Sequence, residues 1–187
     1  MSNRADQAAA TGERITLAAV ELFMERRFDD VTLADIAKAA GVSHQTVLNH
    51  FESKEGVVVA AAEWISSTTS SARQLPSTPD PAAAIRILVT EYERIGDANV
   101  QWAMDADRIA ALAPFMDGGR ASHRAWIEEA FDRDLPTDPK ARKLVVTAVY
   151  AATDVYTWKL LRRDLGLSRA ATEHTILHLV TGALADH

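Results

Sequence analysis

The sequence contains no cysteine, which excludes a disulfide framework, a thiolate metal site and a cysteine nucleophile. It also lacks a long apolar run, because the longest, Val57 to Ala62, is far too short to span a bilayer. The polar start, Met1 to Asp6, is not followed by an apolar stretch of signal-peptide type. We therefore expect a soluble, cytoplasmic protein with no membrane partner.

A strand pattern is missing as well. Alternation of apolar and polar residues does not persist anywhere, whereas apolar residues recur at three- and four-residue steps along most of the chain. Hydrophobic residues make up 48% of the sequence, which is enough for a packed core. We expect an all-α fold of about nine helices, with a three-helix N-terminal head at residues 1–54 and a helical effector and dimerisation domain at residues 55–187.

Prolines, glycines and capping residues divide the chain. The segment Leu75 to Pro81 has three prolines in six residues and predicts the clearest break. Asp80-Pro81 is a start signal for the next helix. The expected helices after that break cover residues 81–96, 99–112, 120–134, 139–164 and 168–184.

The chain has little positive charge for a nucleic-acid binder. The formal net charge is −6, and residues 1–56 hold six basic and nine acidic side chains. A basic footprint is the usual sign of nucleic-acid binding. DNA affinity would therefore depend on a few placed groups, Arg4, Arg14, Lys38 and Lys54, and on helix N-termini, whose N–H groups bind phosphate.

Two short helices joined by a glycine turn are predicted near the N-terminus. Thr32 is a good N-cap with Asp35 three residues later, Gly41 ends the first helix, and Ser43 caps the second, His44 to His50. This arrangement is a helix-turn-helix, in which the second helix lies in the major groove of DNA. The alternative is a short helix pair inside an ordinary bundle.

The second of these helices has an apolar and a polar side. Val47 and Phe51 are expected to face inward, so the outward positions are His44, Gln45, Leu48 and Asn49. Gln and Asn pair bidentately with adenine, and His donates to guanine or to phosphate. The side chains are therefore of the type expected at a base-reading surface.

The sequence of this motif resembles the tetracycline-repressor (TetR-type) family. The matching positions are Thr32, Ile36-Ala37, Ala40-Gly41-Val42-Ser43, Thr46, His50-Phe51 and Ser53-Lys54-Glu55, within a similarity that runs from Arg14 to Val58. The resemblance implies that Thr32, Ser43, Thr46, His50 and Lys54 contact phosphates, and that His44, Gln45 and Asn49 read bases.

Three positions leave alternatives open. Gln45 stands where the family commonly has Gly or Pro, and Leu48 where it has a phosphate-binding Tyr. Leu48 has no hydrogen-bonding group, so we expect it to contact a thymine methyl or a sugar. For His50 the alternative role is to cap the end of its own helix.

The last two helices are predicted to form a homodimer interface. The final helix has a wide apolar face, and the helix before it is apolar nearly all round. Two copies would bind two half-sites of a near-palindromic operator. His174 and His178 have a spacing that zinc accepts, but we expect surface or interface histidines and no metal.

The middle of the chain is rich in large side chains, which are read either as plain core or as the lining of an effector pocket. A polar stripe, Thr147, Tyr150, Asp154 and Thr157, supports a pocket, because buried Asp154 needs a partner. Dimer-interface pairing of Asp154 is the equal alternative. The candidate pocket residues are Trp64, Tyr92, Trp102, Met104, Phe115, Trp126, Phe131, Tyr150, Asp154 and Trp158.

The predicted function is that of a DNA-binding transcriptional regulator, and the resemblance implies a repressor that a small hydrophobic effector releases. Two other classes are weighed against it. One is a helical interaction protein that has lost DNA binding, which the acidic head and Leu48 favour. The other is an enzyme, although no nucleophile–base pair, phosphate loop or carboxylate cluster is present. We expect no catalytic residues and no cofactor.

Overall fold

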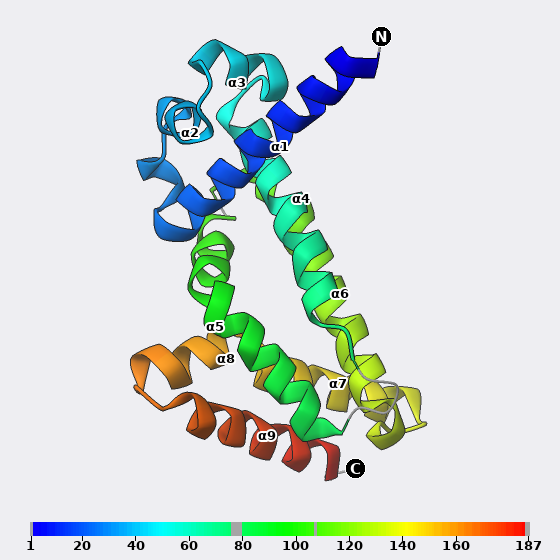
Figure 1. The fold of residues 1–187 in the computed structure, drawn as a ribbon. Helices are drawn as coiled ribbons and strands as arrows, with labels where there is room; N and C mark the ends of the chain where they lie inside the picture. The colour runs from blue at the N-terminus through cyan, green and yellow to red at the C-terminus, as the bar shows by residue number, and fades with distance from the viewer. Residues whose placement is uncertain (1, 76–79, 107, 186–187) are drawn as a thin grey trace. The chain divides into compact units, whose positions relative to one another are not determined.

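The computed structural model describes residues 2–75, 80–106 and 108–185, and within them it confirms an all-α fold with no strand (Figure 1). The helices are α1 Ser2–Glu25, α2 Leu33–Ala40, α3 His44–Phe51, α4 Lys54–Ala72, α5 Pro81–Asp105, α6 Ala113–Phe131, α7 Pro139–Thr153, α8 Val155–Lys159 and α9 Arg169–Ala185. Short 3-10 turns (Phe28–Asp30, Ala110–Leu112, Asp132–Asp134) and a π-helical turn (Leu160–Asp164) complete them.

The chain forms two compact units. The first unit consists of Met1–Thr68 and Gln101–Asp117, and the second of Thr69–Val100 and Gly118–His187. Helices α4, α5 and α6 each have residues in both units. The functional division at residues 54 and 55 stays a prediction.

The first unit is built on the helix-turn-helix. Helix α1 packs against α2 and α3, and α2 packs against α3 (Figure 1). Ile15, Phe23, Ile36 and Val47 are buried among these helices, as their three- and four-residue spacing predicts. Trp102 is also buried in this unit, where its Nε1 donates to the Phe23 carbonyl at 3.4 Å.

The second unit has its own apolar core. Helix α7 packs against α9, and Val149, Trp158 and Ile176 are fully buried. Gly96 of α5 lies directly against the indole of Trp158, because a Cβ on Gly96 would stand 2.5 Å from that ring. The glycine is therefore a packing requirement of this core.

Several predicted helix boundaries are wrong. Residues 81–96 and 99–112 were expected as two helices, but α5 continues through Gly96 to Asp105. Gly96 stands inside this helix because a side chain there would collide with Trp158. Gly118 and Gly119 lie inside α6 and are not a break. The expected helix 139–164 is interrupted at Asp154, which has an extended backbone and N-caps α8.

The ends of the other helices agree better with prediction. Helix α4 ends at Ala72 and α5 begins at Pro81, while residues 76–79 of the proposed proline-rich break lie outside the described residues. Asp80 caps α5 by accepting from the backbone N–H of Ala83 at 2.7 Å. In the part of the chain that the structure describes, no helix is long and apolar enough to cross a membrane.

Candidate nucleic-acid interface and buried polar cluster

Local caps fix the first helix of the helix-turn-helix. Thr32 Oγ1 accepts from the backbone N–H of Asp35 at 3.1 Å, and an Asp35 carboxylate oxygen accepts from the backbone N–H of Thr32 at 2.9 Å. This is the predicted capping box. The hydrogen bonds from Thr32 lower the pKa of Asp35. Gly41 ends the helix with φ of 66°, the left-handed conformation that glycine adopts at least cost.

A second cap sets the start of α3. Ser43 Oγ accepts from the backbone N–H of Thr46 at 3.1 Å and lies 2.8 Å from Thr46 Oγ1. Val47 is fully buried and anchors α3 to the unit. The cap and this anchor together fix which side of α3 faces outward.

The outward side of α3 carries the predicted base-reading residues. His44, Gln45 and Asn49 are exposed, whereas Leu48 and His50 are half-buried. Gln45 Nε2 donates to Asn49 Oδ1 at 2.9 Å. This bond uses one of the two Gln45 N–H groups and leaves both amides with donor and acceptor capacity. The pair is thus held in one geometry on the helix surface.

Lys54 has a structural role inside the unit. Its Nζ donates to the Phe28 carbonyl and lies 3.9 Å from the centre of the Phe28 ring. Partial burial lowers the pKa of Lys54. These contacts tie the turn Phe28–Asp30 to the first residue of α4, so the phosphate contact of Lys54 stays a prediction.

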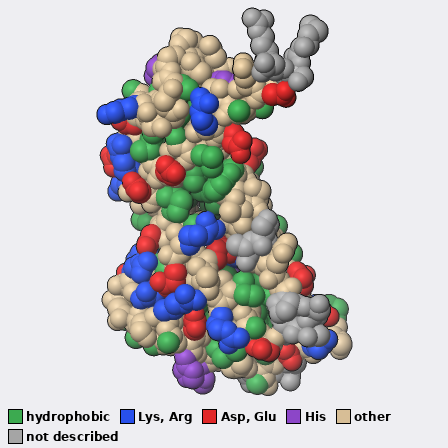
Figure 2. Space-filling view, in the orientation of Figure 1, with side chains coloured by type: hydrophobic (Ala, Val, Ile, Leu, Met, Phe, Trp, Pro, Cys, Tyr) green, Lys and Arg blue, Asp and Glu red, His purple; other side chains and the backbone are tan. Residues whose placement is uncertain are grey.

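The sequence around this motif carries charges of both signs, with six basic and nine acidic side chains in residues 1–56. Figure 2 shows acidic and basic side chains interspersed on the face in view, in keeping with the net charge of −6. Attraction of phosphate would therefore come from individual groups and from helix N-termini.

The candidate pocket residues fall in both units. Trp64, Trp102, Met104 and Phe115 belong to the first unit, where Phe115 packs edge-on against Trp102 with ring centres 5.7 Å apart. Met104 is 62% exposed. The remaining six belong to the second unit: Tyr92, Trp126, Phe131, Tyr150, Asp154 and Trp158.

The second unit also contains a buried ion pair. Arg73, which follows the end of α4, donates through Nε and through a terminal nitrogen to the two carboxylate oxygens of Glu91, the latter at 3.1 Å. The Glu91 side chain is only 1% exposed and that of Arg73 12%. A buried ion pair is tolerated when its remaining polar atoms are also satisfied.

Neighbouring side chains bond to the remaining polar atoms of the Arg73–Glu91 pair. A second terminal nitrogen of Arg73 lies 2.7 Å from His123 Nδ1, and His123 Nε2 lies 3.0 Å from Thr153 Oγ1. Arg73 only donates, so Nδ1 accepts and the proton of the neutral ring is on Nε2. Thr153 Oγ1 in turn donates to the Val149 carbonyl at 2.7 Å. Burial, with a smaller effect of the Arg73 charge, lowers the pKa of His123 to about 3.

Aromatic rings surround this ion pair. The Arg73 guanidinium lies 5.4 Å from the Tyr92 ring centre and 5.8 Å from that of Trp126. His123 stacks on Trp126 and meets Tyr150 edge-on. Trp126 Nε1 is buried and has no hydrogen-bond acceptor among the described residues. We call Arg73, Glu91, Tyr92, His123 and Trp126 the buried cluster.

Asp154 has a partner that the sequence does not reveal. Its carboxylate accepts from the backbone N–H of Tyr156 at 2.9 Å, which caps α8, and burial raises its pKa. The carbonyl of Thr153, the residue before Asp154, accepts from the Tyr92 hydroxyl at 3.0 Å. Thr147 is exposed and bonds within its own helix, so the predicted polar stripe does not form one surface.

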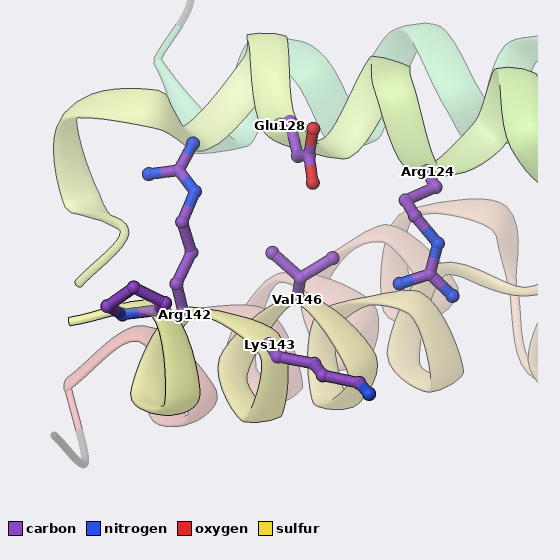
Figure 3. A pocket seen from close by; sticks show the side chains of 6 residues that line it. Arg124, Glu128, Arg142, Lys143 and Val146 are labelled. Carbon is purple, nitrogen blue, oxygen red and sulfur yellow. The ribbon is translucent and has the colours of Figure 1, made fainter. Parts of the chain in front are cut away.

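A small surface pocket of about 210 Å³ lies between α6 and α7. Figure 3 shows Arg124 and Glu128 on one helix facing Arg142, Lys143 and Val146 on the other. Arg142 pairs with Asp132 at 2.9 Å. Among the described lining residues of this pocket there is none of the candidate effector residues.

The C-terminal helices expose apolar side chains, and α9 exposes its histidines. Leu144 of α7 is 72% exposed, and Leu179 of α9 is 45% exposed. His174 and His178 are exposed on α9, and within the described ranges no group of three or more His, Cys, Asp or Glu is placed to hold a metal ion.

The sequence did not single out Arg73, Glu91, His123 or Thr153. One signal was available, because Glu91 continues the apolar series Ala84, Leu88 and Ile95 of α5 at helical spacing. A carboxylate in such a series needs a buried partner, such as a cation. Nothing in the sequence identifies Arg73 as that cation, since it lies beyond the end of a different helix.

Comparisons with known proteins agree with this structure. Residues 15–61 match the family model of bacterial regulatory proteins, tetR family. A curated relative, the HTH-type transcriptional activator FasR of Mycolicibacterium smegmatis, is 26% identical over 82% of this chain, and the chain spans 60% of the length of that relative.

Solved structures share the fold. A tetR-family transcriptional regulator from Streptomyces coelicolor superposes with a TM-score of 0.78 at 22% identity, covering 93% of this chain and 82% of that one. A transcriptional regulator from Rhodococcus has a TM-score of 0.77 at 18% identity, covering 93% and 96%. The multidrug binding protein EbrR, complexed with imidazole, has a TM-score of 0.63 at 19% identity, covering 89% and 88%.

Proposed function

Because residues 15–61 match the tetR family model and the chain shares the fold of tetR-family regulators, we propose that the protein is a homodimeric DNA-binding transcriptional regulator of this family, controlled by a small molecule. The observation that carries the proposal is the outer surface of α3. There, His44, Gln45 and Asn49 are exposed on a helix whose start is fixed by the Ser43 cap. A short helix with this surface fits the major groove, and its amide groups suit adenine.

Phosphate contacts position the helix. We assign them to the exposed or half-buried groups around the two helix starts, Thr32, Ser43 and Thr46, and to His50 and Lys54 at the far end of α3. Leu48 has no hydrogen-bonding group, so it contacts a thymine methyl or a sugar. Thr32 and Ser43 already cap their helices, and Thr46 Oγ1 lies 2.8 Å from Ser43 Oγ. Each hydroxyl retains a lone pair or a donor for DNA.

The dimer is proposed to form through the last helices. Leu144 and Leu179 expose apolar surface there, which a second copy would remove from water. One α3 touches few base pairs, whereas a two-fold pair reads two half-sites about 34–36 Å apart. The operator is then a near-palindrome.

The effector is proposed to bind in the second unit, among Tyr92, Trp126, Tyr150 and Asp154. The likeness to EbrR, a multidrug binding protein complexed with imidazole, supports a small-molecule site in this fold. A ligand changes DNA affinity only through its affinity difference between the DNA-competent and incompetent shapes. Helix α4 starts directly after the helix-turn-helix and has its last residues in the second unit, so it is the segment through which we expect the two to be coupled.

We expect repression that the effector relieves. FasR is named an activator, so the sign is open to a direct test. In a reporter strain, deletion of the gene should raise expression from the operator, and expression that falls would make the protein an activator.

DNA binding is tested by fluorescence anisotropy with the DNA upstream of the coding sequence, in a salt series from 50 to 200 mM. A regulator that contacts six phosphates loses affinity by about three orders of magnitude over this range. Gln45→Ala should lose specificity for the fragment over competitor DNA, and Glu21→Ala, on the exposed side of α1, is the matched control. If a folded dimer binds no fragment at low salt, the protein acts through a protein partner, and this proposal fails.

A further inference from the structure

We propose that the buried cluster is a binding site for a planar organic cation, an amidinium or guanidinium on an aromatic body, and that in this structure the side chain of Arg73 occupies it. The inference deepens the proposed function, since it names the chemical class of the effector and rests on the second unit being its site.

The surroundings of Arg73 are those of a bound cation. The guanidinium makes a two-pronged contact with Glu91 and lies within 6 Å of the ring centres of Tyr92 and Trp126. A carboxylate paired with aromatic faces is the set of groups that holds an organic cation. The Arg73 side chain reaches this position from the chain segment after α4, so it is a tethered occupant and not part of the wall.

The charge directly beside Arg73 favours a cation over an anion, while Arg124 lies farther out, 5.7 Å from the Tyr150 ring centre. Glu91 is buried, Asp154 is half-buried near Arg73, and His123 is neutral because it accepts a hydrogen bond from Arg73. A carboxylate ligand would add a negative charge beside Glu91. A cation that replaces Arg73 leaves the number of charges in the cluster unchanged, which avoids the cost of an unpaired buried carboxylate.

Arg73 does not satisfy every group of the site. Trp126 is 6% exposed, and in the part of the chain that the structure describes its buried Nε1 donor has no acceptor. A buried donor that lacks an acceptor costs about 1–3 kcal/mol. A cation with an acceptor atom on its body would supply what the arginine side chain lacks.

Displacement of Arg73 would also explain how the bound cation controls DNA binding. Glu91 and His123 hold Arg73, the residue next to the end of α4, and a cation that takes its place releases that end. The released segment belongs to the helix that begins just after the helix-turn-helix. Binding of the cation and binding of DNA are therefore expected to oppose each other.

The test uses the full-length chain, with benzamidine as the probe, and compares wild type with Arg73→Ala. Removal of the tethered cation should let benzamidine bind at least tenfold more tightly than to wild type, measured by tryptophan fluorescence and by the rise in Tm. Benzamide, which has the same shape without the charge, and benzoate, which has the opposite charge, should each bind Arg73→Ala at least tenfold more weakly than benzamidine.

Two variants make the result specific. Arg142→Ala removes an arginine of a surface ion pair in the same unit and should not gain benzamidine affinity. Arg73→Met keeps an apolar side chain at the site and should gain it. If Arg73→Ala does not fold alone, benzamidine, and neither control compound, should restore its helical circular dichroism.

Three results would overturn the inference: equal benzamidine affinity of wild type and both Arg73 variants, equal rescue by benzamide, or tighter binding of benzoate. The proposed function fails separately. If DNA binding is absent but Arg73→Ala still prefers benzamidine, the cation site stands without the regulator. If DNA binds and the preference is absent, only the cation site is wrong.

Discussion

The helix-turn-helix and the buried cluster satisfy their polar side chains in different ways. In the helix-turn-helix, Thr32 and Ser43 bond to groups three residues away. In the second unit, Arg73 bonds to Glu91 and His123, which lie 18 and 50 residues away in the sequence. The first kind of bond leaves polar side chains of α3 at the surface, where DNA can meet them. The second kind buries charge in the core, where it depends on partners from other helices.

The largest expected effect breaks the buried ion pair. Glu91→Gln leaves the Arg73 charge buried without its carboxylate, so the free energy of unfolding should fall by about 3–5 kcal/mol. Urea denaturation at fixed protein concentration measures the loss. The exposed pair Arg163–Asp97 gives the control, since Asp97→Asn should cost less than about 1 kcal/mol.

Replacing both partners sharpens the same point. In Arg73→Met with Glu91→Met no unpaired charge remains, so most of the stability lost in Glu91→Gln should return. Equal losses in the double and single variants would show that packing, and not charge, holds the cluster together.

Steric fit in the second unit is the next effect. Gly96→Ala would place a Cβ 2.5 Å from the Trp158 indole, and such overpacking costs about 1–3 kcal/mol. A Cβ on Gly118 of α6 would have no atom within 4 Å from the rest of the described chain, its own helix backbone aside, so Gly118→Ala should gain about 0.5–1 kcal/mol. Thermal melts of the two variants should therefore shift in opposite directions, and parallel shifts would contradict the packing at Trp158.

The pH dependence of stability depends on the same cluster. The folded pKa of His123, about 3, lies below its ordinary value of 6.5, so the unfolded chain binds a proton first as pH falls. Stability from the neutral ring is therefore complete above pH 6.5 and is lost toward pH 3, at up to about 1.4 kcal/mol per pH unit. The difference in unfolding free energy between wild type and His123→Gln isolates this slope.

The smallest effect concerns the local bonds of the helix-turn-helix. Ser43→Ala removes the cap of α3 and should cost about 1 kcal/mol. Thr147→Ala removes an exposed hydroxyl that bonds within its own helix and should change stability by less than about 0.5 kcal/mol. If Ser43→Ala lowers the free energy of unfolding no more than Thr147→Ala does, tertiary packing alone positions α3.

The difference between local and long-range bonds explains which features the sequence could predict. The capping box of Thr32, the glycine turn and the Ser43 cap are local signals, and all three were predicted correctly. Gly96 reads as a break in sequence, but its role depends on Trp158, 62 positions away. The sequence pattern did not reveal the partner of Glu91, because Arg73 comes from a different segment of the chain. It did not reveal the interruption at Asp154 either, because that depends on the bond from the backbone N–H of Tyr156 to the Asp154 carboxylate.

The most direct test of the account is selection of DNA from a randomised library by wild type, Gln45→Ala and Asn49→Ala. The account predicts that wild type enriches a near-palindrome with half-sites about one helical turn apart. Each variant should lose its preference at the same positions of both half-sites. Enrichment of an identical sequence by all three proteins would contradict base reading by α3, and no enrichment by a folded wild-type dimer would contradict DNA recognition altogether.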